Sequence, residues 1–188
     1  VLSVFAGLRP LAAPRSEGKK TKEISRSHKL IREKSGLITI IGGKWTTYRK
    51  MAQDTLDLAI RYMHIPTKDC ITERYQIHGS RKNPDFSDPL YVYGTDADEI
   101  RNLVASSPAM AEKLHPDYAY TVGEVTWLVR NEMPRTLEDV LARRLRILFL
   151  DARAAMAMAP KVAGILATEW GKDETCLLYT SDAADDSL

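Results

Sequence analysis

Two consecutive glycines, Gly42 and Gly43, mark a change of hydrophobic period that constrains the fold more than any other feature of the chain. Before them, residues 37–41 read Leu-Ile-Thr-Ile-Ile, which favours a strand. After them, apolar residues recur with the helical period of about 3.6, which predicts a helix. The helical stripe comprises Tyr48, Met51, Ala52, Thr55, Leu56, Ala59, Ile60 and Met63, and Thr46 and Thr47 are its expected N-caps. The chain therefore passes from a strand through a glycine turn into the N-terminus of a helix.

A second strand is expected just before this one. Residues 23–31 read EISRSHKLI and are followed by the turn Glu-Lys-Ser-Gly, in which Gly36 can adopt a positive backbone angle. This pattern predicts a β-hairpin. Residues 1–11 also alternate apolar and small residues as far as Arg9-Pro10, which predicts a further strand that leaves its sheet at a Pro-restricted turn.

The second half of the chain favours helices. Residues 65–90 are rich in Pro, Asp, Asn, Ser and Lys and follow no period, so we interpret them as a linker before a second domain. Capping patterns then predict several short helices. The expected signals are Asp96 with Glu99, Thr121 with Glu124, Thr136 before a helix over 137–150, Pro160 at the opening of the last helix and Gly171 at its end.

Composition limits the function classes. With 44% hydrophobic residues among 188, the chain can bury a core, and its formal net charge of +2 is too small to indicate nucleic-acid binding. Lys and Arg nevertheless crowd residues 9–50, an asymmetry that can mark a site for a polyanion. Cys70 and Cys176 lack metal-ligand spacing, and no metal is expected. No run of about 18 apolar residues is present.

The segment Gly-Gly-Lys-Trp-Thr-Thr at residues 42–47 is a candidate anion site. A helix N-terminus offers unpaired backbone N–H groups and the positive end of the helix dipole, and Lys44 adds a full charge. Such a turn can stabilise a phosphate or the negative charge of a reduced flavin. The plainer alternative is a strand-to-helix turn with a solvated lysine. A P-loop is excluded, because the four-residue spacer and second glycine before the lysine are missing.

Three other residues could join an anionic pocket. Arg9 precedes a proline that fixes its backbone, and a fixed guanidinium suits a phosphate or a carboxylate. Arg26 and His28 share one strand face and can point into one pocket. A surface arginine and a structural histidine are the competing interpretations. By contrast, we assign three other sets of residues to packing: Arg143, Arg144 and Arg146 to the polar face of a helix, residues 152–160 to a close helix interface, and Trp127 to the core.

Several strings together resemble the FAD-dependent, quinone-linked glycerol-3-phosphate dehydrogenases. AGLRPL at 6–11, ISRSH at 24–28 and GLITIIGGKWTTYRKMAQD at 36–54 are similar to successive blocks of the family's flavin domain, and residues 124–152 are similar to its helical C-terminal domain. The resemblance covers about residues 1–174. It implies an α+β C-terminal fragment, in which the last strands and helix of an FAD-binding, glutathione-reductase-like domain precede an all-helical domain.

The resemblance also implies a site and a reaction. Arg9, Arg26 and Lys44 correspond to basic residues that bind the phosphate of glycerol 3-phosphate or line its pocket. Gly42, Gly43, Lys44, Trp45, Thr46 and Thr47 correspond to the turn that approaches the isoalloxazine ring of FAD. The family transfers a hydride from substrate C2 to flavin N5, giving dihydroxyacetone phosphate, and passes the electrons to a quinone. His28 is a weak candidate for the base, and the true base can also lie outside this chain.

Location and partners follow from the same resemblance. It implies peripheral attachment to the inner membrane, on the cytoplasmic side in bacteria or in mitochondria, and a role in glycerol metabolism. A homodimer is compatible with the sequence, and no nucleic-acid partner is expected. The domain boundaries implied are 1–64 for the FAD and substrate part, 65–92 for the linker, 93–174 for the helical domain and 175–188 for a non-native tail that looks like translated sequencing adapter.

One departure from the family pattern limits the expected activity. The glycines of this chain nowhere form GxGxxG, so the segment that binds the FAD pyrophosphate is absent, and we expect the chain alone to be inactive and to bind FAD weakly. Two rival functions stay open. One is a glycerol-3-phosphate oxidase or a related amino-acid-oxidase-like flavoenzyme. The other is a noncatalytic module in which the basic N-terminal half binds a polyanion.

Overall fold

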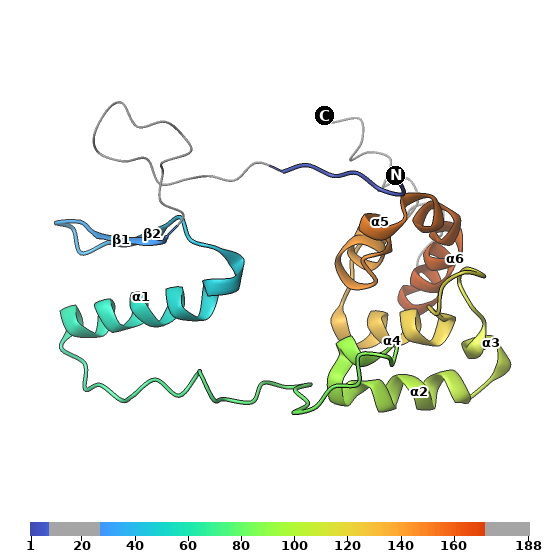
Figure 1. Ribbon diagram of the computed structural model, residues 1–188, viewed down its shortest axis with the longest axis horizontal. Helices are drawn as coiled ribbons and strands as arrows, with labels where there is room; N and C mark the ends of the chain where they lie inside the picture. Colours follow the sequence, from blue (N-terminus) through green and yellow to red (C-terminus); the bar gives the residue numbers. More distant parts are fainter. Residues whose placement is uncertain (8–26, 172–188) are drawn as a thin grey trace. The chain divides into compact units, whose positions relative to one another are not determined.

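The computed structural model describes residues 1–7 and 27–171, which fall into two compact units (Figure 1). The hairpin–helix unit comprises residues 7–76, and the helical unit comprises residues 1–6 and 77–188. In the described part of the chain, helices dominate and one two-stranded sheet is present. This agrees with the expected mixture of a small sheet and a helical C-terminal region.

The predicted hairpin is confirmed over residues 29–41, but its first strand begins only at Lys29. His28 therefore lies before the strand and not on its face, and residues 23–26 of the expected strand lie outside the described residues. Strand β1 (Lys29–Arg32) pairs antiparallel with β2 (Ile38–Ile41), with Lys29 opposite Ile41 and Arg32 opposite Ile38. Two backbone hydrogen bonds close the turn: Glu33 N–H donates to Leu37 O at 2.9 Å, and Gly36 N–H donates to Glu33 O at 3.0 Å. Gly36 has φ 91°, the positive angle for which a glycine was expected.

The predicted helix is also confirmed, but its caps are not. A 3₁₀ turn, η2 (Trp45–Thr47), leads into α1 (Tyr48–Met63), and β2 contacts α1 (Figure 1). Neither Thr46 nor Thr47 accepts a capping hydrogen bond, because the chain enters α1 through the 3₁₀ turn. The Thr47 hydroxyl instead donates backwards to Lys44 O at 3.0 Å.

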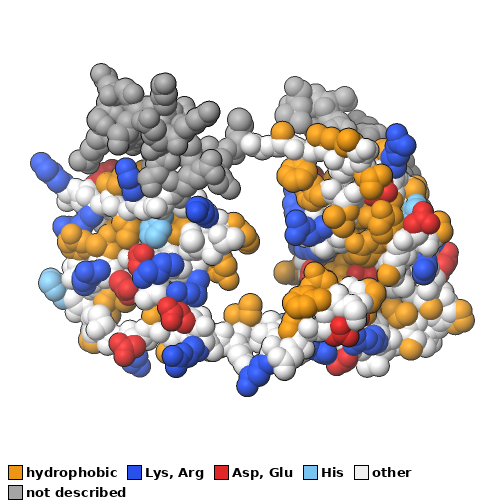
Figure 2. All heavy atoms as spheres, viewed as in Figure 1, with side chains coloured by type: hydrophobic (Ala, Val, Ile, Leu, Met, Phe, Trp, Pro, Cys, Tyr) orange, Lys and Arg blue, Asp and Glu red, His pale blue; other side chains and the backbone are white. Residues whose placement is uncertain are grey.

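The apolar stripe of α1 is not a closed core. The helix contains no fully buried residue, and Leu56 and Met63 are 61% and 69% exposed. Figure 2 shows hydrophobic side chains at the surface on the visible faces of both units. The periodicity therefore predicted the helix correctly, while the partner surface that would cover this stripe is absent from the described residues.

Residues 65–90 contain turns but no helix or strand. The helical unit then begins with the 3₁₀ segment η3 (Tyr91–Asp96). Its other elements are α2 (Ala97–Ala105), α3 (Pro108–Ala111), α4 (Val122–Glu132), the π-helical turn η4 (Asp139–Arg144), α5 (Ile147–Leu150) and α6 (Ala152–Trp170).

The helical unit is built around α4, which packs against α2 on one side and α6 on the other (Figure 1). Trp127 is buried, as predicted, and its Nε1–H donates to Glu99 Oε2 at 3.0 Å. Ala154, Ala155 and Met158 are buried on α6, which confirms the close helix interface. The largest fully buried side chains of this core include Ile100, Val125, Leu128, Val140, Ile147, Met158, Val162 and Leu166.

Of the five predicted helix signals, three are confirmed and two, Asp96 and Pro160, are wrong. Thr121 Oγ1 accepts from Glu124 N at 3.2 Å, Thr136 Oγ1 accepts from Asp139 N at 3.1 Å, and Gly171 ends α6 with φ 61°. Asp96, however, makes no capping bond at the start of α2. Its carboxylate is 2.8 Å from His78 Nε2 instead, because the segment before α2 folds back on it.

The predicted helix over 137–150 is interrupted. It begins with helical residues at 137–138, continues as the π-helical turn η4 and breaks at Arg146, whose φ of 61° ends the hydrogen-bonded run before α5. Arg143 pairs with Glu138 and Asp139, and Arg144 Nε lies 3.2 Å from Glu132 Oε2. Arg143 and Arg144 thus lie on the polar face that was expected, whereas Arg146 lies exposed at the break between η4 and α5.

The expectations for the start of α6 and for the first residues of the chain are wrong. Pro160 lies inside α6 and does not open it, because Asp151 caps the helix earlier by accepting from the backbone N–H groups of Arg153 and Ala154 at 3.1 Å. Residues 1–7 form no strand. Leu2 O accepts from Ala152 N at 3.1 Å, and the Phe5 ring contacts Phe149 edge-on at 4.9 Å. Residues 8–11 of the expected strand lie outside the described residues.

Candidate functional site

The glycine turn is held close to α1 and to the segment before β1. Gly42 and Gly43 have φ of 74° and 91°, which residues with a side chain rarely adopt. A Cβ built on Gly43 would lie 2.5 Å from Met51 Sδ and 3.3 Å from His28 Cβ. The structure therefore brings two predicted site elements together, because His28 lies beside the Gly-Gly-Lys turn.

The turn leaves a row of backbone donors without partners. Among the described residues, Gly43, Lys44, Trp45 and Thr46 make no backbone N–H hydrogen bond, and the first such bond is from Thr47 N to Lys44 O at 3.0 Å. These groups precede the 16-residue helix α1, whose dipole places partial positive charge at this end. The arrangement suits an anion or an electron-rich carbonyl.

Lys44 and Trp45 complete this surface. The Lys44 side chain is exposed, and its ammonium has no hydrogen bond or ion pair within the described part of the chain. Trp45 is 85% exposed, and its ring lies 5.7 Å from that of Tyr48 with an interplanar angle of 31°. A free cation thus adjoins a flat aromatic surface, a combination that can hold a planar anionic group.

His28 belongs to a small charged cluster. Its Nε2 lies 3.0 Å from Asp54 Oδ2, and Lys50 Nζ lies 2.8 Å from Asp54 Oδ1. The hydrogen bond from Lys50 is the main cause that lowers the pKa of Asp54, and His28 lowers it further, while partial desolvation acts in the opposite direction. The same hydrogen bond raises the pKa of Lys50. Asp54 is consequently ionised near neutral pH.

Asp54 and Lys50 were not among the residues singled out from the sequence. Their spacing of four residues on a predicted helix was a usable signal for an ion pair. Their pairing with His28, which is 26 residues away from Asp54, depends on the packing of α1 near the hairpin and has no local signal. Arg9 and Arg26 lie outside the described residues.

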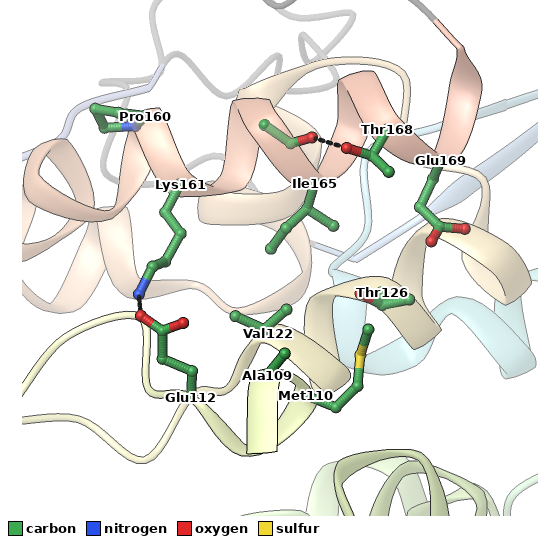
Figure 3. A pocket seen from close by; sticks show the side chains of 11 residues that line it. Ala109, Met110, Glu112, Val122, Thr126, Pro160, Lys161, Ile165, Thr168 and Glu169 are labelled. Carbon is green, nitrogen blue, oxygen red and sulfur yellow. Dashed lines mark hydrogen bonds and ion pairs between the residues drawn. The ribbon is translucent and has the colours of Figure 1, made fainter. Parts of the chain in front are cut away.

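The helical unit contains a cavity of about 620 Å³ between α3, α4 and α6 (Figure 3). Lys161 donates to Glu112 and to Lys113 O at its rim, and Thr168 Oγ1 donates to Gly164 O at 2.8 Å. Glu169 accepts two hydrogen bonds from Arg130 at 2.7 and 2.8 Å. These charged groups satisfy one another, so the cavity offers a ligand no unpaired charge from the described residues.

A buried carboxyl lies elsewhere in the helical unit. Glu124 is only 4% exposed, and Tyr93 Oη–H donates to its Oε1 at 2.7 Å. Burial raises the pKa of Glu124, while the Tyr93 hydroxyl and the Thr121 backbone N–H partly oppose this rise. Burial and the neighbouring carboxylate raise the pKa of Tyr93 as well. The pair joins η3 to α4 and is a structural contact of the core.

Residues 1–7 and 27–171 contain neither a membrane-spanning helix nor a metal-binding cluster. None of the helices among them is both long and apolar enough to cross a membrane. Within the same residues, no group of three or more His, Cys, Asp or Glu side chains is arranged to hold a metal ion.

Residues 37–176 match the family described as the C-terminal domain of alpha-glycerophosphate oxidase, and the chain therefore belongs to that family. The match includes the Gly-Gly-Lys turn, α1 and all of the helical unit from residue 77 to Gly171. Together with the relatives described next, this match confirms the resemblance to the glycerol-3-phosphate dehydrogenase family. His28 lies before the matched residues.

The curated relatives are named as mitochondrial glycerol-3-phosphate dehydrogenases. One from Arabidopsis thaliana is 34% identical over 205 residues, covering 92% of this chain and 32% of the relative. A probable one from Dictyostelium discoideum is 36% identical over 189 residues, covering 89% and 30%, and one from Homo sapiens is 30% identical over 198 residues, covering 93% and 26%. The chain thus spans about a third or less of these relatives.

Proposed function

We propose that this chain forms part of an FAD-dependent oxidoreductase that oxidises sn-glycerol 3-phosphate to dihydroxyacetone phosphate. The observation that carries the proposal is the family match over residues 37–176, supported by relatives that are named glycerol-3-phosphate dehydrogenases. The described site adds a chemical reason. Among the described residues, it presents backbone donors and a lysine without partners, beside an exposed indole, at one helix N-terminus, and these groups suit a planar, electron-rich ring and an anionic substrate.

FAD is the proposed cofactor, and it would supply the hydride acceptor. The turn at residues 42–47 would approach the isoalloxazine ring, with the N–H groups of Gly43 and Lys44 placed to stabilise negative charge on it. Trp45 and Thr46 would present their exposed faces to the same ligand. Gly42 and Thr47 would fix the backbone, the former through its positive φ and the latter through its two bonds to Lys44 O.

Lys44, together with Arg9 and Arg26, is proposed to bind the substrate phosphate. A dianionic phosphate leaves water only when several cations replace its hydration, and arginines bind it through paired N–H donors. The exposed Lys44 ammonium beside the turn has no partner in residues 1–7 and 27–171, which suits it to this role. His28, which lies against Gly43, is the proposed acceptor of the substrate hydroxyl proton.

We propose a role for each segment of the chain. Residues 1–64 would contribute to the FAD and substrate domain, residues 65–92 would connect it to the helical domain at 93–174, and residues 175–188 would be a non-native tail. The parent protein would attach peripherally to an inner membrane, mitochondrial in a eukaryote, and would pass electrons to a quinone. The names of the relatives, which are mitochondrial dehydrogenases, support this location.

A glycerol-3-phosphate oxidase is the alternative, because the matched family is described through an oxidase. The two differ in the electron acceptor. A complete protein carrying this chain that reduces a quinone analogue without producing peroxide would be the dehydrogenase, whereas stoichiometric peroxide would make it the oxidase.

Substitution of Lys44 tests the proposed site. In the complete protein, Lys44→Ala should raise KM for glycerol 3-phosphate about 10- to 100-fold, the loss expected for one charge-assisted hydrogen bond. Lys34→Ala is the matched control, because Lys34 is an exposed lysine in the hairpin turn of the same unit, and it should leave KM unchanged. Equal effects of the two substitutions would show only a general charge effect and would argue against a phosphate contact at Lys44.

A further inference from the structure

The contact between His28 and Asp54 has the geometry of a histidine whose ring is oriented by a carboxylate. His28 lies directly before β1, Asp54 lies in the second turn of α1, and the His28 Nε2 to Asp54 Oδ2 distance is 3.0 Å. Both side chains are half-buried, with 21% and 29% of their surfaces exposed. The ring is therefore held at one nitrogen while still reachable by a small molecule.

The charge on Asp54 decides which nitrogen of His28 carries the proton. Lys50 lies 2.8 Å from the other carboxylate oxygen and lowers the pKa of Asp54, so the carboxylate can accept hydrogen bonds but cannot donate one. A neutral His28 must then donate through Nε2–H. In that tautomer Nδ1 carries the lone pair of the ring, and the hydrogen bond of His28 to Asp54 does not use it.

From this geometry we infer that Asp54 is a positioning residue, which keeps His28 in the tautomer whose Nδ1 can take the proton of the substrate's C2 hydroxyl. The inference rests on the proposed function. Bound FAD would supply the hydride acceptor: the C2–H bond would break with its electron pair leaving as hydride, while the O–H bond would break with its proton passing to Nδ1 of His28. The C2–O bond would become a carbonyl, and the adjacent Asp54 carboxylate would stabilise the imidazolium that forms.

A double-mutant cycle on the complete flavoprotein tests this role. Asp54→Asn should lower kcat for glycerol 3-phosphate about 10- to 100-fold, as is typical when the partner that orients a histidine is neutralised, and should leave KM within about twofold. His28→Asn should lower kcat at least as much. Because Asp54 acts through His28, Asp54→Asn should cause no further loss in the His28→Asn background.

Lys50→Gln is the control for a merely structural ion pair. It removes the second partner of Asp54 but leaves the contact with His28, and an aspartate with an ordinary pKa is still ionised at neutral pH. We therefore expect kcat within about twofold of the parent value. A larger loss, equal to that of Asp54→Asn, would overturn the inference, because it would show that the ion pair as such is required.

The other outcomes separate the inference from the proposed function. If Asp54→Asn lowers kcat equally with and without His28, Asp54 does not act through His28 and the inference fails. If His28→Asn retains full kcat, His28 is not the proton acceptor, and the inference fails while the proposed function stands. If glycerol 3-phosphate does not reduce the bound flavin of the parent protein, the proposed function itself fails. Flavin content and circular dichroism, measured for each variant, identify a misfolded protein. In the parent chain, ¹⁵N NMR of His28 shows directly which ring nitrogen carries the proton: Nε2–H is expected, and Nδ1–H would contradict the inference.

Discussion

Removing the hydroxyl of Tyr93 should destabilise the helical unit in a way that depends on the charge of Glu124. Tyr93→Phe deletes the 2.7 Å hydrogen bond to Glu124 Oε1 but keeps the ring, which contacts Trp127 edge-on at 5.7 Å. Glu124 is 4% exposed, so water cannot readily replace the lost donor. A hydrogen bond to a buried charged group contributes about 1.5–3 kcal/mol, and we expect the free energy of unfolding to fall by that amount at pH about 8.

The pH dependence provides the internal check. Burial raises the pKa of Glu124 above its ordinary value of 4.5, so the folded chain takes up a proton more readily than the unfolded chain. Glu124 therefore contributes most stability below pH 4.5, and this contribution is lost as pH rises through the folded-state pKa. Tyr93→Phe removes a donor that lowers this pKa, so its cost should grow with pH.

Urea unfolding of the 188-residue chain, followed by circular dichroism at pH about 5 and about 8, measures these effects. Glu124→Gln is the matched control, because it keeps an oxygen acceptor for Tyr93 and cannot ionise. In that background, Tyr93→Phe should cost only about 0.5–1.5 kcal/mol at either pH. A cost at pH about 8 that is equal in the two backgrounds would refute the argument from a buried charge.

Three further substitutions test the packing of the helical unit by the same unfolding measurement. Asp151→Ala removes the acceptor for the N–H groups of Arg153 and Ala154 and for the Tyr118 hydroxyl. It should lower the free energy of unfolding by about 1–2 kcal/mol. Asp151→Asn keeps an acceptor oxygen and should lower it by less than half as much. Gly123→Ala should destabilise by about 1–3 kcal/mol despite the better helix propensity of alanine, because the added Cβ would lie 2.9 Å from Val104 Cγ2 and 3.0 Å from the backbone oxygen of Met110; a stabilised variant would contradict this packing. Met158→Ala, at a fully buried position on α6, should cost about 2–5 kcal/mol, and a cost below 1 kcal/mol would show that the α6 face is not part of the core.

Local signals in the sequence were sufficient for elements whose ends are fixed by their own residues. The hairpin, α1, the caps at Thr121 and Thr136, and the stop at Gly171 each depend on a nearby pattern, and each is present. One error arose where a tertiary contact replaced a local pattern, because Asp96 binds His78, 18 residues away, in place of capping α2. The other concerned a local signal that was not used: Asp151 caps α6 well before Pro160.

The candidate site was predictable only in its contiguous part. The turn at 42–47 is continuous in sequence, so its glycines and lysine could be singled out directly. The His28 and Asp54 contact joins the segment before β1 to α1, and no spacing rule predicts such a pair. The same limit applies to the apolar stripe of α1, in which no residue is fully buried: a helical period predicts a face that packs but does not identify what covers it.

The most direct test of the central claim is anaerobic flavin reduction in the complete protein that carries this chain. The bound flavin should lose its oxidised absorbance on addition of glycerol 3-phosphate, and glycerol, which lacks the phosphate, should have no effect at the same concentration. Bleaching by glycerol 3-phosphate alone would establish the proposed oxidation and its dependence on the phosphate. A flavin that stays oxidised with both compounds would contradict the assignment of glycerol 3-phosphate as the substrate.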